Sequence, residues 1–139
     1  MVEIIVTTMI ILETSINMIL KIAPVSKPRM TRADRWKKRQ SVLKFFAFRD
    51  AIRQSSAWET LELVDMDSFK IVFHVQMPKT WSKKKKALYD GKPHQQRPDL
   101  DNFLKAWKDS VYEEDAIVWH VEATKLWTSD PGYIMVIQT

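Results

Sequence analysis

Cysteine is absent from the 139-residue sequence, and glycine occurs only twice. The absence of cysteine excludes disulfide bridges, cysteine-ligated zinc, iron–sulfur clusters and thiol nucleophiles, and it is typical of a reducing compartment. With so little glycine, the chain contains neither G-x-G-x-x-G nor G-x-x-x-x-G-K-[ST]. These are the usual loops for binding dinucleotides and nucleotides, so we expect no nucleotide cofactor.

Long apolar runs are missing as well. The most apolar part of the chain, residues 1–20, is interrupted by Glu3 and Glu13. The nine residues between them (4–12) are far short of the about 20 that span a bilayer. Residues 1–20 also lack the positive segment and the small-residue cleavage site of a secretory signal. We expect no membrane association, and we interpret residues 1–17 as an extension in front of one domain over residues 18–139.

Charge is plentiful but unevenly distributed. The chain has 22 Lys and Arg against 17 Asp and Glu, a net charge of +5. Residues 21–53 hold 11 basic and 2 acidic side chains, residues 79–98 hold 7 basic and 1 acidic, and residues 99–139 hold 8 acidic and 3 basic. Two basic segments beside one acidic segment are typical of a protein that binds a polyanion and places a metal ion against it.

The hydrophobic pattern predicts an α+β domain in the order β–α–β–α–β–β, with a small mixed sheet and two main helices. Thr31 and Asp34 resemble a capping box at the start of the first helix. Prolines predict that residues 24–30 and 78–98 are loops. The strands are expected at residues 18–23, 69–75, 116–126 and 133–138, and the helices at residues 33–57 and 100–111.

Two acidic residues separated by one position mark the most informative segment, which reads Arg97-Pro98-Asp99-Leu100-Asp101-Asn102-Phe103-Leu104-Lys105. If the backbone is still extended there, Asp99 and Asp101 point the same way. Two carboxylates that close repel each other unless a proton or a cation relieves them. Oxygen ligands without cysteine favour Mg²⁺, or Mn²⁺, over zinc. A metal held this way can activate water and stabilise charge on a phosphodiester.

Further charged residues follow on the same expected helix. Lys105 comes four residues after Asp101, so it lies about one turn on, where it can pair with the carboxylate or reach a phosphate. Glu113, Glu114 and Asp115 come at the helix end and could return a third carboxylate to the first two. The same residues also fit a helix cap, an ion pair along the helix and a solvated acidic turn. Spacing alone leaves both interpretations open.

These residues resemble a known family. The string Asp99-Leu100-Asp101-Asn102-Phe103-Leu104-Lys105, with Glu114-Asp115 leading into a strand, is similar to the signature of the RusA-type Holliday junction resolvases. Lys27-Pro28-Arg29-Met30-Thr31 and the basic segment after it resemble phage members of that family. The resemblance covers about residues 18–139. It implies a homodimeric endodeoxyribonuclease, in the cytoplasm of a bacterial or phage-infected cell, that acts in DNA recombination and repair.

The resemblance also implies roles for single residues. It assigns the Mg²⁺ ligands to Asp99, Asp101 and Asp115, and an essential lysine to Lys105. The segment between Asp101 and Asp115 is shorter than in the type member, so Glu114 could serve in place of its neighbour. The implied reaction is a pair of nicks in opposed strands of a four-way junction, one by each subunit. The basic residues expected to contact this branched DNA are Lys27, Arg29, Arg32, Lys83, Lys84, Lys85, Lys86 and Arg97.

Two other hypotheses compete with this one. Pro98-Asp99 with Glu122-Ala123-Thr124-Lys125 faintly resembles a PD-(D/E)XK nuclease, although Glu-x-x-Lys has one residue too many. A change at Lys125 would cripple that nuclease, whereas in a RusA-type enzyme we expect it to be nearly silent. Alternatively, the chain is a non-catalytic basic DNA-binding protein, whose aspartates only cap helices and whose binding falls steeply with salt.

Overall fold

Four strands form one mixed sheet at the centre of the molecule. The computed structural model describes residues 16–35 and 39–139, so the expectations for residues 1–15 lie outside the described residues. The strands are β1 (Asn17–Leu20), β2 (Ser68–Gln76), β3 (His120–Thr128) and β4 (Tyr133–Gln138), in the order β1-β4-β2-β3. β2 and β3 run parallel, whereas β4 is antiparallel to both β1 and β2. Parallel strands need a long crossover, and this crossover carries the candidate site.

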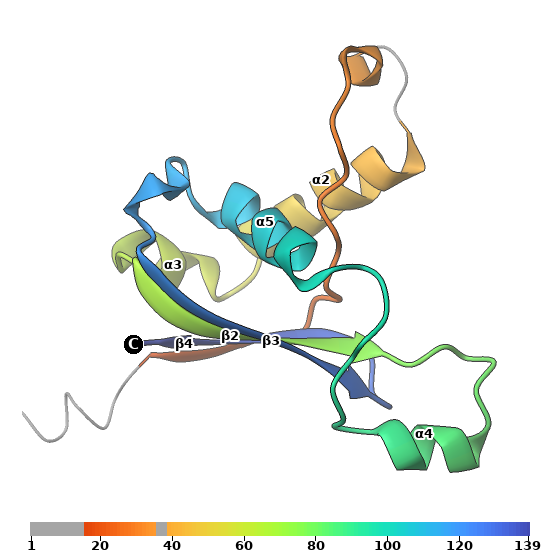
Figure 1. Cartoon of the computed structure of the whole chain (residues 1–139). Helices are drawn as coiled ribbons and strands as arrows, with labels where there is room; N and C mark the ends of the chain where they lie inside the picture. Colours follow the sequence, from red (N-terminus) through yellow and green to blue (C-terminus); the bar gives the residue numbers. More distant parts are fainter. Residues whose placement is uncertain (1–15, 36–38) are drawn as a thin grey trace, which may run out of the picture.

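Three helices cover one face of the sheet (Figure 1). They are α2 (Gln40–Arg53), α3 (Trp58–Leu63) and α5 (Leu100–Val111), of which α5 belongs to the crossover. A fourth helix, α4 (Lys83–Tyr89), lies apart from them beyond the end of β2. No helix of the described residues is both long and apolar enough to cross a membrane. The α+β fold with a small mixed sheet, predicted from the sequence, is confirmed.

The core lies between the sheet and α5. Alternate residues of β2 point toward the helices, and Phe69, Ile71 and Phe73 are fully buried there. The ring of Phe73 stacks on that of Phe103 in α5, with the centroids 5.4 Å apart. Phe103 and Trp107 lie four residues apart on α5, so they share the buried face of the helix. This contact fixes α5, and with it the residues at its N-terminal end, relative to the sheet.

The prediction of one helix over residues 33–57 is wrong. The chain forms a short 3₁₀ helix, η1 (Arg32–Arg35), and then α2, which begins after an extended Arg39. Residues 36–38 of the expected helix lie outside the described residues. The capping box is partly confirmed, because the carboxylate of Asp34 accepts the backbone N–H of Thr31 at 2.6 Å. Arg39, just before α2, donates to both oxygens of Asp34 in η1, and this bidentate pair joins the two helices.

Other segments also differ from the expectation: the strand expected at residues 18–23 is β1, which ends at Leu20, and α3 was not expected. The proline-rich residues 78–98 contain α4, which Ser82 caps by accepting the backbone N–H of Lys85 at 3.1 Å. Serine followed by a run of good helix formers was the available signal for this helix. The strand expected from residue 116 begins only at His120, after a second 3₁₀ helix, η2 (Asp115–Ile117). The carboxylate of Glu114 starts η2 by accepting the backbone N–H of Ala116.

Candidate active site

Asp99 and Asp101 lie together at the N-terminal end of α5. Asp99 is the N-cap residue and has an extended backbone, whereas Asp101 lies in the first turn of the helix. The helix begins at Leu100, so the extended backbone assumed from the sequence ends at Asp99, and the two residues share the start of the helix instead. Both residues are exposed. Free N–H groups and the helix dipole favour negative charge at this end.

The carboxylates of this pair form neither a side-chain helix cap nor an ion pair along the helix among the described residues. Asp99 occupies the cap position, but its side chain makes no capping hydrogen bond. Among the ion pairs of the described residues, none joins Asp101 to Lys105. Lys105 is exposed, one turn further along α5. Two carboxylates and an ammonium group therefore face solvent at one helix end, where a cation and a phosphate can approach.

Asp115 lies at the other end of α5, in η2 (Figure 1). Its carboxylate is 3.7 Å from the ammonium of Lys108 in the last turn of α5. Lys108 follows Asp101 by seven residues, which corresponds to about 10 Å along a helix axis. In the part of the chain that the structure describes, no three His, Cys, Asp or Glu side chains are grouped to hold a metal. The role of Asp115, or of its neighbour Glu114, stays a prediction.

The donor set at the start of α5 nevertheless fits a hard divalent cation. Mg²⁺ is usually held by one or two carboxylates, and waters and substrate phosphate complete its shell. Asp99 and Asp101 supply two exposed carboxylates that form no ion pair within the described residues, and the chain has no cysteine that would favour zinc. These two residues would hold the cation. When bound there, it would supply Lewis-acid activation of water and of the phosphodiester.

The segment that leads to Asp99 is attached to the edge strand β3. Trp127 donates its backbone N–H to Lys92 O, and His94 donates its own to Lys125 O, at 2.9 and 3.0 Å. The ring of His94 lies 4.0 Å from that of Trp127, centroid to centroid. Residues 92–94 therefore run along β3 and are held there by hydrogen bonds. The chain that leads on to Asp99 thus begins at a fixed position. The long segment 78–98 is held in place by these contacts and by α4.

The buried His94 and the half-buried His74 are expected to make stability depend on pH. Burial lowers the pKa of His94, helped by the charge of Lys125, and burial also lowers the pKa of His74. The fold therefore favours the neutral form of each ring, so this contribution to stability is present above the unfolded value near 6.5 and is lost as the pH falls below it. We expect the urea concentration at the midpoint of unfolding to decrease when the pH is lowered from about 7.5 to about 5.5. His94→Phe should flatten this dependence, and equal slopes in the wild type and in His94→Phe would contradict the assignment.

The basic residues predicted to contact DNA differ in how many partners they already have within the protein. The backbone N–H of Lys27 donates to Asn102 O at 3.1 Å, which brings residues 24–30 against α5. The ammonium of Lys27 lies 3.2 Å from Asp109 and 4.0 Å from the ring centre of Phe45, so it already has partners within the protein. By contrast, three arginines of the predicted DNA surface are exposed and are better placed to reach a phosphate: Arg29, Arg32 and Arg97.

Helix α4 presents the lysine run to solvent. Lys83, Lys84 and Lys85 are exposed, and Lys86 is half-buried. Trp81 anchors this helix, because its ring lies 4.9 Å from that of Trp127 and 4.1 Å from the ammonium of Lys85. The predicted loop of lysines is thus a short basic helix with a fixed position relative to β3.

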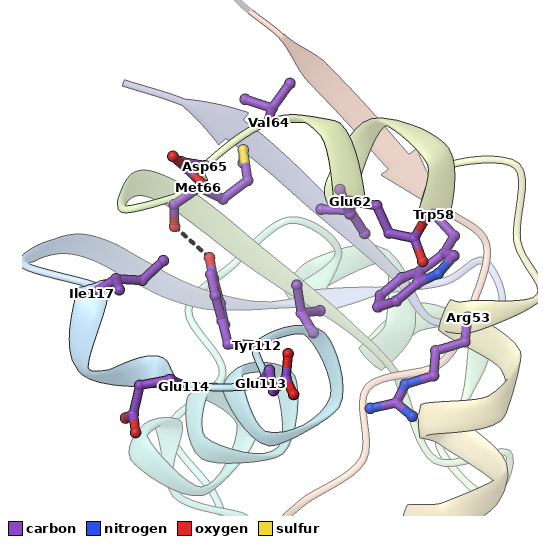
Figure 2. A pocket seen from close by; sticks show the side chains of 12 residues that line it. Arg53, Trp58, Glu62, Val64, Asp65, Met66, Tyr112, Glu113, Glu114 and Ile117 are labelled. Atoms are coloured by element: carbon purple, nitrogen blue, oxygen red, sulfur yellow. Dashed lines mark hydrogen bonds between the residues drawn. The ribbon is translucent and has the colours of Figure 1, made fainter.

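A cavity of about 640 Å³ lies at the end of α5 that carries Asp115, and no sequence pattern indicated it. Figure 2 shows Arg53 and Trp58 on one side of this cavity and Glu113 and Glu114 on another. The hydroxyl of Tyr112 donates to Met66 O across it, and burial raises the pKa of this tyrosine. The lining is acidic, because it includes Glu62, Asp65, Glu113 and Glu114. Such a lining repels phosphate, so it does not compete with the start of α5 as a DNA site.

Comparison with known proteins identifies a family. Residues 21–138 match the model of the family described as Endodeoxyribonuclease RusA. The matched range includes Asp99, Asp101, Lys105 and Asp115, and it spans both basic segments. None of the curated proteins matches the chain.

Proposed function

The chain belongs to the RusA endodeoxyribonuclease family, and we propose that it resolves four-way DNA junctions by paired, metal-dependent nicks. Membership makes the chain a nuclease that acts on DNA. The observation that carries the finer proposal is the pair of exposed carboxylates of Asp99 and Asp101 at the N-terminal end of α5, which form no ion pair within the described residues. A helix N-terminus, two carboxylates and a nearby lysine together suit the hydrolysis of a phosphodiester in the presence of Mg²⁺ or Mn²⁺.

Each residue of the site has a proposed part. Asp99 and Asp101 would hold the cation on the exposed side of the helix end, where it would supply Lewis-acid activation of water and of the scissile phosphate. Lys105 reaches the phosphate from one turn away and stabilises the negative charge that develops on its oxygens. The family resemblance assigns a further ligand role to Asp115. Because the fold places Asp115 beside Lys108 at the other end of α5, the proposal rests on Asp99 and Asp101. The flanking backbone of the DNA is held by the lysines of α4 together with Arg29, Arg32 and Arg97.

A four-way junction presents two symmetric strands, so we propose a homodimer that carries one site in each subunit. A two-fold axis that matches the axis of the junction places the two sites on opposed strands. Two sites working together explain how paired nicks release two duplexes. Analytical ultracentrifugation of the free protein tests the dimer separately from cleavage.

The PD-(D/E)XK alternative is weakened by the direction of the side chains on β3. Glu122 and Lys125 are three residues apart on one strand, so they point to opposite faces of the sheet. A PD-(D/E)XK site needs its acidic residue and its lysine on the same side of the strand. A non-catalytic DNA-binding protein remains the alternative outcome of the assay below.

The proposed function is tested by incubating the protein with a labelled synthetic junction and with linear duplex of the same sequence, with and without Mg²⁺. We expect symmetric nicks in the junction, only with the metal present, and little cleavage of the duplex. Replacing Mg²⁺ by Ca²⁺ should preserve binding and allow the affinity to be measured without cleavage. Binding that is steeply salt-dependent but never followed by cleavage would establish the non-catalytic alternative.

The lysines of α4 should contribute to junction affinity through phosphates alone. Changing Lys83, Lys84, Lys85 and Lys86 to Gln is expected to weaken binding to every sequence equally. The slope of log K against log salt should become shallower by about 0.9 for each phosphate that the helix no longer neutralises. Lys21→Gln, which removes an exposed charge just after β1, is the control. An unchanged slope in Ca²⁺ buffer would remove α4 from the proposed DNA surface.

A further inference from the structure

Among the lysines of the described residues, Lys125 is the one whose ammonium donates hydrogen bonds to backbone carbonyls. It lies in β3 opposite Phe73 of β2, a residue that is buried beneath α5. Its Nζ donates to Gln96 O at 2.6 Å and to Pro98 O at 2.7 Å. Among the ion pairs of the described residues, none involves Lys125. The ammonium is therefore used to hold two carbonyl groups.

Those two carbonyls belong to the short segment that delivers the candidate metal ligands. Pro98 O is part of the peptide unit that continues into the N–H of Asp99, and Gln96 O lies on the other side of Arg97. Asp99 then begins α5, with Asn102 and Phe103 donating their N–H groups to Asp99 O. A hydrogen bond from a charged donor is shorter and stronger than one between neutral groups. Lys125 thus fixes the backbone immediately before Asp99.

The other hydrogen bonds of the segment before Asp99 hold its two ends and not its middle. Residues 92–94 are held on β3 by backbone hydrogen bonds, and the helix holds the chain from Asp99 onward. Residues 95–97 lie between these two supports and are exposed. Over residues 95–98, the described hydrogen bonds to the rest of the protein are the two that Lys125 donates. Removal of the ammonium would free this connection and loosen the first turn of α5.

We propose that Lys125 is a positioning residue for the nuclease site, which sets the place of Asp99 and Asp101 through the backbone carbonyls of Gln96 and Pro98. The proposal rests on the proposed function, since it concerns the same two carboxylates. It replaces the expectation that a change at Lys125 is nearly silent. It also gives this lysine a task different from that of a PD-(D/E)XK lysine, because its ammonium holds main-chain oxygens and does not meet the phosphate.

The test compares Lys125→Met and Lys125→Arg in the full chain, with Lys70→Met on the neighbouring strand β2 as the control. We expect Lys125→Met to lower the cleavage rate at saturating junction at least about tenfold, with junction affinity in Ca²⁺ unchanged within about twofold. The Mg²⁺ concentration for half-maximal rate should rise. Lys125→Arg should recover most of the rate, because a guanidinium can donate to both carbonyls. Lys70→Met should behave as the wild type.

Two readouts are independent of cleavage. Binding of Mn²⁺ to the protein without DNA, measured by titration calorimetry, should weaken in Lys125→Met. Amide hydrogen exchange should accelerate in peptides that cover residues 95–103, whereas peptides from α2 should keep their protection. A wild-type Mn²⁺ affinity together with wild-type exchange in Lys125→Met would overturn the positioning role. If Asp101→Asn also cleaves normally, the proposed function itself fails; if only Lys125→Met is normal, this inference alone fails.

Discussion

Asp101→Asn is expected to abolish cleavage of a four-way junction while junction binding stays intact or tightens. The amide has nearly the shape of the carboxylate, so the helix end should keep its structure, but a neutral oxygen holds a divalent cation far less well. Removal of the negative charge also reduces repulsion of the DNA phosphates. Single-turnover cleavage in Mg²⁺ and binding in Ca²⁺ measure the two effects separately. Asp99→Asn should give the same pattern.

Glu122→Gln is the matched control for this result. It removes the same charge from an exposed position on β3, and it leaves the start of α5 untouched. We expect wild-type cleavage from this variant, whereas a PD-(D/E)XK site would lose activity with it. Wild-type nicking by Asp101→Asn would refute the assignment of the site. Asp115→Asn is the third variant to compare. We expect it to lose cleavage if Asp115 binds the same cation as Asp99 and Asp101.

Phe73→Ala is expected to cost about 3–5 kcal/mol in the free energy of unfolding. The ring is completely buried in the central strand β2 and stacks on Phe103 of α5, so its loss opens a cavity beneath the helix that carries the site. Neighbouring side chains of a close-packed core cannot fill such a space without shifting. Urea denaturation followed by circular dichroism measures the loss.

Phe46→Ala provides the comparison for the core variant. This ring lies on α2 with 37% of its surface exposed, so its removal should cost at most about 1 kcal/mol. If the two variants lose equal stability, the packing of Phe73 against α5 is not the main support of this part of the fold. Partial unfolding of Phe73→Ala at room temperature would agree with the prediction, since it indicates a loss comparable to the whole stability of the domain.

The sequence determined most of the sheet and the helix that carries the candidate site. β2, β4 and α5 are confirmed within one residue of their expected bounds, because each combines a clear apolar period with a proline, a turn or a cap at its ends. The grouping of Asp99, Asp101 and Lys105 at one helix end also follows from spacing along a single helix. Local patterns of this kind depend on neighbours in the sequence, so the sequence alone contains them.

Only the tertiary structure decided which distant residues meet. Asp115 lies at the far end of α5 from Asp99, where η2 follows the helix and the carboxylate pairs with Lys108 instead of returning to Asp99 and Asp101. Lys125 is distant from Asp99 along the chain, and it reaches the carbonyl before that residue only because β3 runs beside the crossover segment. Lys27 is likewise turned from solvent by Asp109 and Phe45. Contacts between residues far apart along the chain are set by packing, which no local pattern records.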